Sequence, residues 1–271
     1  MHSASALVTG ASRGIGRAIA AELAARGFGL TITSRSEGDL RALRPALLDA
    51  GAPQVELVAA DLANRDAVET TAKAHGAAFG SMDALILNAG TGKAAPIDGY
   101  PHHRAKQTFE VNFFAALSLV QASLPLLRKA ARRDKQSAGR VIALSSITGA
   151  HAERDLAVYG ASKAALLSLM ETLTLEEAAN GVLGTAVAPG YVRTDMSAWV
   201  TDTVPADTMI PPEDVARVVG TILGLGPQTV VTRIVMSRAA ADVYAASRLR
   251  PAGRDRGPAP ACAQLHPGRR H

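Results

Sequence analysis

Three side chains that can move protons lie close together in the sequence: Ser146, Tyr159 and Lys163. The segment Val158–Leu175 is rich in Ala, Leu, Met and Glu and contains no Pro, which predicts a helix. Tyr159 and Lys163 then lie one turn apart on the same face. A free phenol titrates at about pH 10, and a nearby ammonium lowers that pKa. The trio can therefore pass a proton to or from an oxygen atom.

The apolar run Val141–Leu144 just before Ser146 predicts a buried strand. In an open α/β sheet, ligands bind at the C-terminal ends of the strands, so Ser146 can face the next helix there. The trio carries no hydride, so a redox function needs a cofactor. Tyr-x-x-x-Lys is also common on helices without a catalytic role, and the nucleotide signals elsewhere decide between these alternatives.

A glycine-rich turn follows the first predicted strand, Ala6–Val8, and precedes a predicted helix at Arg17–Arg26. Glycines let the backbone approach a phosphate closely, and a helix N-terminus attracts negative charge. The strand–turn–helix order is the context that a dinucleotide site requires, although a tight turn without a ligand remains the alternative. The candidate cofactor-binding residues of this turn are Gly10, Ser12, Arg13, Gly14, Ile15 and Gly16.

The end of the second predicted strand, Phe28–Ser34, favours NADP(H) over NAD(H). An acidic residue there typically binds the ribose hydroxyl of NAD, whereas an arginine accommodates the phosphate of NADP. Here the strand is followed by Arg35, with no carboxylate before Glu37, and Arg13 is a second guanidinium within reach. Either arginine alone is equally compatible with a solvated surface residue.

Further candidate cofactor residues follow the other predicted strands. These strands are predicted at Gln54–Ala59, Ala84–Leu87 and Val182–Ala188. After them come Asp61 and Leu62; Asn88, Ala89 and Gly90; and Pro189, Gly190, Val192 and Thr194. Asp61 is equally suited to cap the next helix. The loop 195–211 contains several apolar residues, which suggests a lid over a substrate.

Strands alternate with helices throughout, which predicts a single-domain Rossmann-type doubly wound parallel sheet with helices on both faces over residues 1–238. The last strand is expected at Thr229–Val235. A long helix is expected at Arg104–Arg132, where Asn112 lies among apolar residues and must find hydrogen bonds, from a bound water or from a neighbouring backbone group.

Composition limits the setting of the protein. The chain has 271 residues, is 48% hydrophobic and contains a single cysteine, Cys262, which excludes an intramolecular disulfide and any cysteine-based metal site. We expect a cytoplasmic protein with no metal site, no signal segment and no membrane span.

The net charge of +5 originates from the C-terminal end. Residues 248–271 hold six of the 29 basic residues and one of the 24 acidic ones, so the rest of the chain is neutral. We expect 239–271 to be a disordered basic tail rich in Pro, Gly and Arg. Nucleic-acid binding through this tail is the alternative. We expect no nucleic-acid partner, because the rest of the chain is neutral.

The motifs resemble, in their order and spacing, those of the short-chain dehydrogenase/reductases. They are TGASRGIG at 9–16, NAG at 88–90, Asn112, Ser146, YGASK at 159–163 and PGYVRT at 189–194, and the resemblance covers about residues 4–236. It implies that Tyr159 is the acid–base group and that Lys163 binds the nicotinamide ribose and lowers the tyrosine pKa. It also implies that Ser146 holds the substrate oxygen and Asn112 supports a water relay.

By the same resemblance, Gly10, Gly14 and Gly16 lie at the pyrophosphate, Asn88 lies near the adenosine ribose, and the protein is a homodimer or homotetramer. The segment Thr232–Arg238 departs from the Gly-rich stretch of many members, so subunit contacts made there are not carried over.

The expected function is NADPH-dependent reduction of a ketone or aldehyde to an alcohol, with 3-oxoacyl thioesters as one substrate class. The alternatives are a diketone, pterin or steroid substrate, or a non-catalytic NADP-binding sensor or scaffold.

Overall fold

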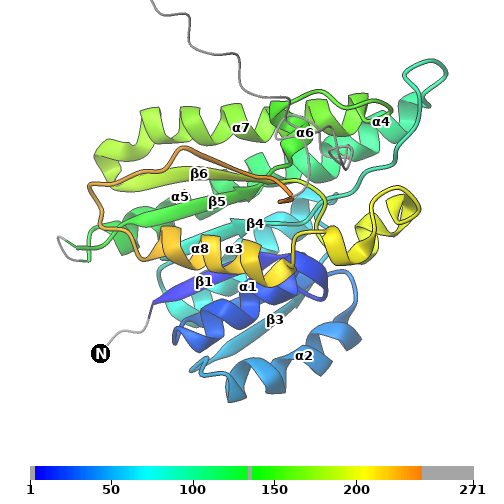
Figure 1. Ribbon diagram of the computed structural model, residues 1–271. Coiled ribbons are helices and arrows are strands. Elements are labelled where there is room, and N and C mark those ends of the chain that lie inside the picture. The colour runs from blue at the N-terminus through cyan, green and yellow to red at the C-terminus, as the bar shows by residue number, and fades with distance from the viewer. Residues whose placement is uncertain (1–3, 134–135, 240–271) are drawn as a thin grey trace, which may run out of the picture.

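A seven-stranded parallel sheet forms the centre of the protein (Figure 1). The computed structural model describes residues 4–133 and 136–239. The strand order is β3-β2-β1-β4-β5-β6-β7, and every neighbouring pair is parallel. The strands are β1 (Ser5–Thr9), β2 (Gly29–Ser34), β3 (Val55–Ala59), β4 (Ala84–Leu87), β5 (Gly139–Leu144), β6 (Val182–Pro189) and β7 (Arg233–Met236).

Helices cover both faces of the sheet, which confirms the predicted doubly wound α/β fold (Figure 1). On one face, α1 (Gly14–Ala25), α2 (Glu37–Asp49) and α8 (Pro212–Leu223) share one core cluster. On the other face, α3 (Arg65–Phe79), α5 (Ala115–Ala131) and α7 (Ala157–Glu177) share the second.

The first strand shows why both faces need a helical layer. Ala6 and Val8 belong to the core cluster under α1, whereas Leu7 belongs to the cluster on the opposite face. All three side chains are fully buried. A strand with apolar side chains on both of its faces must be covered on both sides, as is usual for parallel sheets.

The strand order reverses at β1, because β2 and β3 extend to one side of it and β4 to β7 to the other. In a parallel sheet all C-terminal strand ends meet at one edge, and the reversal opens a crevice there. The residues that follow β1, β4, β5 and β6 are therefore brought together, although they come from distant parts of the chain.

Several predicted elements differ in detail. The expected helix 104–132 consists of α4 (His102–Phe109), a π-helical turn at Glu110–Phe114 and α5. The last strand begins at Arg233, four residues later than expected. The region 195–211, predicted as a loop, contains two short 3₁₀ helices, Asp195–Val200 and Ala206–Thr208. The short helix α6 (Ile147–Ala150) was not anticipated.

The predicted boundary after 238 cannot be compared with the fold, because residues 240–271 of the expected tail lie outside the described residues. Within the described part, the helical stretch His102–Ala131 is long and apolar enough to cross a membrane by length and composition alone. Its α5 segment packs against β5 and α3 and contributes Leu119, Val120 and Leu127 to the core, as a core helix of a globular domain does.

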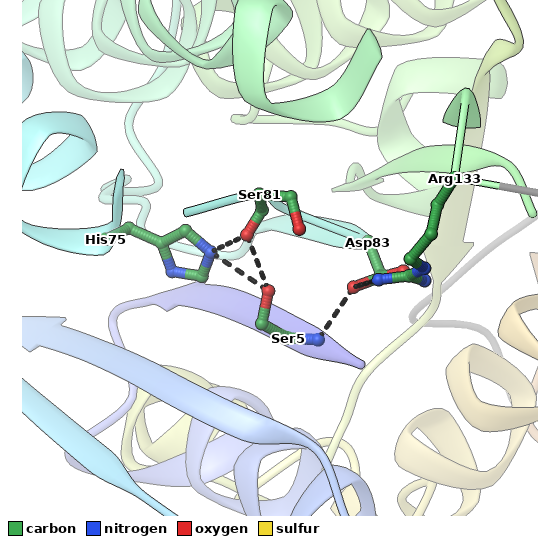
Figure 2. Close-up of polar contacts among 5 residues, drawn as sticks. All are labelled: Ser5, His75, Ser81, Asp83 and Arg133. Atoms are coloured by element: carbon green, nitrogen blue, oxygen red, sulfur yellow. Dashed lines mark hydrogen bonds and ion pairs between the residues drawn. The ribbon is translucent and has the colours of Figure 1, made fainter. Parts of the chain in front are cut away.

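A buried polar cluster joins the start of β1 to the end of α3 (Figure 2). It lies at the N-terminal ends of the strands, away from the crevice. The His75 ring is fully buried and lies 2.8 Å from Thr31 Oγ1 and 3.3 Å from Ser5 Oγ. Ser5 Oγ donates to the Ser81 carbonyl, and Asp83 accepts from the Ser5 N–H while pairing with Arg133. Burial lowers the pKa of His75 to about 4, so this cluster is built around a neutral imidazole.

We predict that His75 makes the protein sensitive to acid. Because the folded pKa of His75, about 4, lies below the ordinary value of 6.5, its contribution to stability is complete above pH 6.5 and is lost as the pH falls towards 4. Urea unfolding at pH 7 and pH 4.5 should show a smaller loss of unfolding free energy for His75→Gln than for the wild type. The exposed-site control His103→Gln should follow the wild type. Parallel losses in the wild type and His75→Gln would contradict the assignment.

Candidate active site

Two reciprocal hydrogen bonds tie the end of β5 to α7. Lys163 Nζ donates to the Leu144 carbonyl at 2.8 Å, and Ser145 Oγ donates to the Lys163 carbonyl at 2.7 Å. Ser146 follows directly and begins α6, where its Oγ accepts from Thr148 N and Thr148 Oγ1. Since Tyr159 lies one turn before Lys163 on α7, this pairing sets the position of Ser146 relative to the phenol.

The Tyr159 ring is held against the backbone of the loop after β4. A Cβ on Gly92 would lie only 2.4 Å from Tyr159 Cδ2, so a glycine is needed for this approach. Lys163 Nζ lies 5.7 Å from the centroid of the ring. Neither sequence pattern nor motif indicated Gly92, because the contact depends on how the loop passes over α7.

Burial governs the protonation preferences of Tyr159 and Lys163. Burial raises the pKa of Tyr159 to about 12, while a hydrogen bond with the Ser146 side chain acts in the opposite direction. Burial also lowers the pKa of Lys163 to about 8. Desolvation therefore dominates at both groups, because it penalises their charged forms, and the lowering of the tyrosine pKa by Lys163 stays a prediction.

The turn after β1 forms a close-packed cradle of the kind that a dinucleotide phosphate requires. Gly10 and Gly14 adopt positive φ angles of 64° and 54°. A Cβ on Gly16 would lie 2.2 Å from the Gly10 carbonyl oxygen, so no side chain fits there. Asn88 Nδ2 donates to the Thr9 and Gly10 carbonyls, and Thr9 Oγ1 accepts from the Asn88 and Ala89 N–H groups.

Two adjoining cavities lie at this edge of the sheet, and Tyr159 lines both of them. The first, called here the cofactor groove, runs past the glycine turn. The predicted residues that line it are Gly10, Arg13, Gly14, Ile15, Asn88, Ala89, Gly90, Tyr159, Lys163 and Thr194. The second, called here the substrate pocket, brings together Ile15, Ser146, Tyr159, Pro189, Gly190, Val192 and Thr194.

The remaining predicted site residues do not line either cavity. Gly16 packs beneath the turn, and Ser12 belongs to the turn without lining the groove. Arg35 is exposed after β2 and has no ion pair or hydrogen bond among the described residues. Asp61 Oδ1 accepts from the Ala63 N–H beyond β3, and Leu62 is half-buried beside it.

Asn112 lies in the π-helical turn and is nearly fully buried. Its side-chain amide exchanges two hydrogen bonds with the Thr91 backbone, at 2.8 and 2.9 Å, and donates to Ser162 Oγ. The amide thus bonds to a backbone group, which is one of the two alternatives open from the sequence. It joins the loop after β4 to α7, which carries Tyr159.

Arg13 is paired across the mouth of the cofactor groove. Its Nη1 donates to Asp195 Oδ2 at 3.1 Å, and both side chains are largely exposed. Asp195 was not recognised from the sequence, because a lone aspartate in a predicted loop carries no signal. An exposed pair of this kind contributes little to stability, so Arg13 can exchange Asp195 for another anion.

The segment 195–211, predicted as a lid, is partly buried and partly exposed. Val200, Val204 and Met209 are buried and form a small core with Tyr191. Met196 and Trp199 are about half exposed and line the substrate pocket. The Trp199 ring packs edge-on against Tyr191, with centroids 6.1 Å apart. The segment is thus a structured wall of the pocket.

The chain belongs to the short-chain dehydrogenase family, whose model matches residues 4–204. It is an oxidoreductase of the kind that acts on alcohol or carbonyl groups with a nicotinamide dinucleotide.

Named relatives agree with this family. An uncharacterized oxidoreductase of Staphylococcus epidermidis is 34% identical over 192 residues, covering 71% of this chain and 79% of that protein. The 3-oxoacyl-[acyl-carrier-protein] reductase FabG of the same species is 32% identical over 198 residues, covering 73% and 79%. Among solved structures, the Pseudomonas aeruginosa RhlG/NADP active-site complex has a TM-score of 0.78 and 28% identity, covering 86% of this chain and 93% of that one.

We predict that Lys163 imposes a pH dependence on stability. Its folded pKa of about 8 lies below the ordinary 10.5, so the wild type gains stability as the pH rises from 8 to 10.5. This pKa difference corresponds to roughly 3 kcal/mol. Chemical unfolding at pH 7.5 and 10.5 should show this gain in the wild type and in the exposed-site control Lys106→Met, but not in Lys163→Met. The same gain in Lys163→Met would rule out the buried ammonium as its source.

Proposed function

We propose that the protein is an NADPH-dependent reductase that converts a ketone or aldehyde to an alcohol. The observation that carries this proposal is the position of the Tyr159 phenol, which lines both the cofactor groove and the substrate pocket. A group at that junction can protonate a substrate oxygen at the place where a hydride arrives.

The proposed chemistry divides between cofactor and protein. The reduced nicotinamide, when bound, supplies the hydride that adds to the carbonyl carbon. Tyr159 transfers its phenolic proton to the carbonyl oxygen, which becomes the alcohol, and the phenol then regains a proton from solvent. Ser146, which lines the substrate pocket, holds the same oxygen. Lys163 holds the nicotinamide ribose, and its Nζ remains anchored on Leu144.

Tyr159 has the protonation state that a proton donor requires, and the reductive direction itself is proposed from the preference for NADPH. With its pKa raised to about 12, Tyr159 carries its proton at neutral pH and is ready to donate it. Asn112 acts in this proposal as a positioning residue, since its side-chain amide is committed to Thr91 and Ser162.

The proposed cofactor contacts follow the groove. Gly10, Gly14 and Gly16 accommodate the pyrophosphate, and Asn88 adjoins the adenosine ribose. Arg13 and Arg35 bind the phosphate that distinguishes NADP from NAD. The FabG relative supports a 3-oxoacyl thioester as substrate, while diketone, pterin and steroid ketones are the alternatives. We further propose a cytoplasmic homodimer or homotetramer, with Phe114 and Leu175 as exposed apolar residues on helices that a partner can cover.

Replacing Tyr159 with Phe should abolish most of the turnover, because the variant lacks the proton that the alkoxide needs. General acids typically contribute about 10²- to 10⁴-fold, so we expect a decrease of at least about 100-fold in kcat. NADPH binding, followed by nicotinamide fluorescence, should stay nearly unchanged. Tyr100→Phe, outside both cavities, is the matched control. Turnover retained in Tyr159→Phe would refute the assignment, and NADPH binding without turnover in the wild type would favour a sensor.

Arg35 and Arg13 should determine cofactor choice. Replacing either with Ala removes charged hydrogen bonds to the phosphate, so we expect the Kd for NADPH to rise by about tenfold or more while the Kd for NADH stays constant. Arg17→Ala, also exposed and on the first turn of α1, controls for a general loss of positive charge. Equal binding of NADPH and NADH by the wild type would show that the arginines face solvent only.

A further inference from the structure

The substrate pocket contains a carboxylate with one unused oxygen. Glu153 lines this pocket, and its Oε1 accepts a hydrogen bond from Tyr191 Oη at 3.2 Å. Its Oε2 is buried and receives no hydrogen bond from any described residue. Buried carboxylate oxygens in folded proteins are normally hydrogen-bonded, so an orphaned one on a residue that lines a cavity points to a donor that a bound ligand supplies.

The backbone around Glu153 is fixed rather than adaptable. The Leu156 N–H donates to the Glu153 carbonyl at 3.4 Å, and Asp155 adopts a left-handed conformation with φ of 64°. The Asp155 carbonyl accepts from the Ala95 N–H at 2.8 Å, which joins this turn to the loop after β4. The carboxylate is therefore presented to the pocket by a turn held at both sides.

Tyr191 donates its hydroxyl proton to Glu153. Burial and the neighbouring Glu153 carboxylate raise the pKa of Tyr191, so its phenol keeps its proton. That one proton is used on Oε1, and Tyr191 is further restrained by the Trp199 ring. Oε1 is thereby occupied, and the buried Oε2 of this pocket-lining residue is left without a hydrogen-bond donor among the described residues.

The charge balance around the carboxylate favours a neutral partner. Arg238 is 4% exposed and interacts electrostatically with both Glu153 and Tyr191. Its guanidinium already balances the carboxylate, so an added ammonium would place a second positive charge in the same buried region. The other walls of the pocket are largely apolar and include Ile147, Leu156 and Val192.

We propose that Glu153 is a specificity-determining residue that binds a neutral hydrogen-bond donor, of which a hydroxyl is the simplest, on the substrate. The substrate class is then a carbonyl compound with an apolar body and a hydroxyl group in addition to the reacting carbonyl. This inference rests on the proposed reductase function and deepens it, because it concerns the same pocket and not the proton transfer itself.

The test compares ketones of equal size in which a hydroxyl replaces a methyl group. Two pairs cover different spans: hydroxyacetone with butanone, and para-hydroxyphenylacetone with para-methylphenylacetone. The wild type should favour the hydroxyl member of at least one pair by about tenfold or more in kcat/KM, the range of a hydrogen bond to a charged group. In Glu153→Gln an amide replaces the carboxylate at equal size, so the ratio should fall towards one. Glu213→Gln, an exposed site on α8, should keep the wild-type ratio.

Three results would overturn the inference. They are a ratio near one for both pairs in the wild type, an unchanged ratio in Glu153→Gln, and a stronger preference for para-(aminomethyl)phenylacetone than for the hydroxyl compound. If no ketone is reduced, the proposed function fails, and quenching of Trp199, the single tryptophan and a residue of this pocket, decides the inference by itself. Tighter binding of the hydroxyl members, lost in Glu153→Gln, would then still support it, and equal binding would refute it.

Discussion

The active-site geometry depends on the paired hydrogen bonds between the end of β5 and Lys163. The Leu144 carbonyl needs a donor because β5 stops pairing there, and the buried Lys163 ammonium needs an acceptor because it has lost water. Ser145 completes the exchange by donating to the Lys163 carbonyl. A strand end and a helix are thus fixed to one another by groups that would each be costly to leave unpaired. Ser146 lies two residues after Leu144, and Tyr159 lies one helical turn before Lys163. Both are therefore positioned by this pairing.

The parallel sheet provides the second constraint. Because its strands all end at one edge, the glycine turn, the loop after β4 and the Ser146 segment meet without being neighbours in sequence. Asn88 and Thr9 join the first two of these, and Asn112 joins the loop after β4 to α7. The same hydrogen-bonded framework therefore shapes the cofactor groove and the substrate pocket, and Tyr159 lines both cavities.

The sequence predicted what depends on local pattern and missed what depends on long-range packing. The fold follows from apolar strands alternating with helices, and the glycine turn and YGASK motif carry their chemistry in short segments. Burial raises the pKa of Tyr159 and lowers that of Lys163, and burial cannot be read from the spacing of the two residues. Gly92 and Glu153 lie in loops without a motif, so only the tertiary structure brings them against Tyr159 and Tyr191.

The central claim is that a substrate carbonyl is reduced at the junction that Tyr159 occupies between the two cavities. The most direct measurement uses NADPH deuterated at C4 of the nicotinamide with para-hydroxyphenylacetone, followed by mass spectrometry of the alcohol. We expect one deuterium on the carbinol carbon, transferred from the cofactor, with the hydroxyl proton exchanging with water. An alcohol without deuterium on that carbon, or no alcohol formed with any carbonyl compound tested, would contradict it.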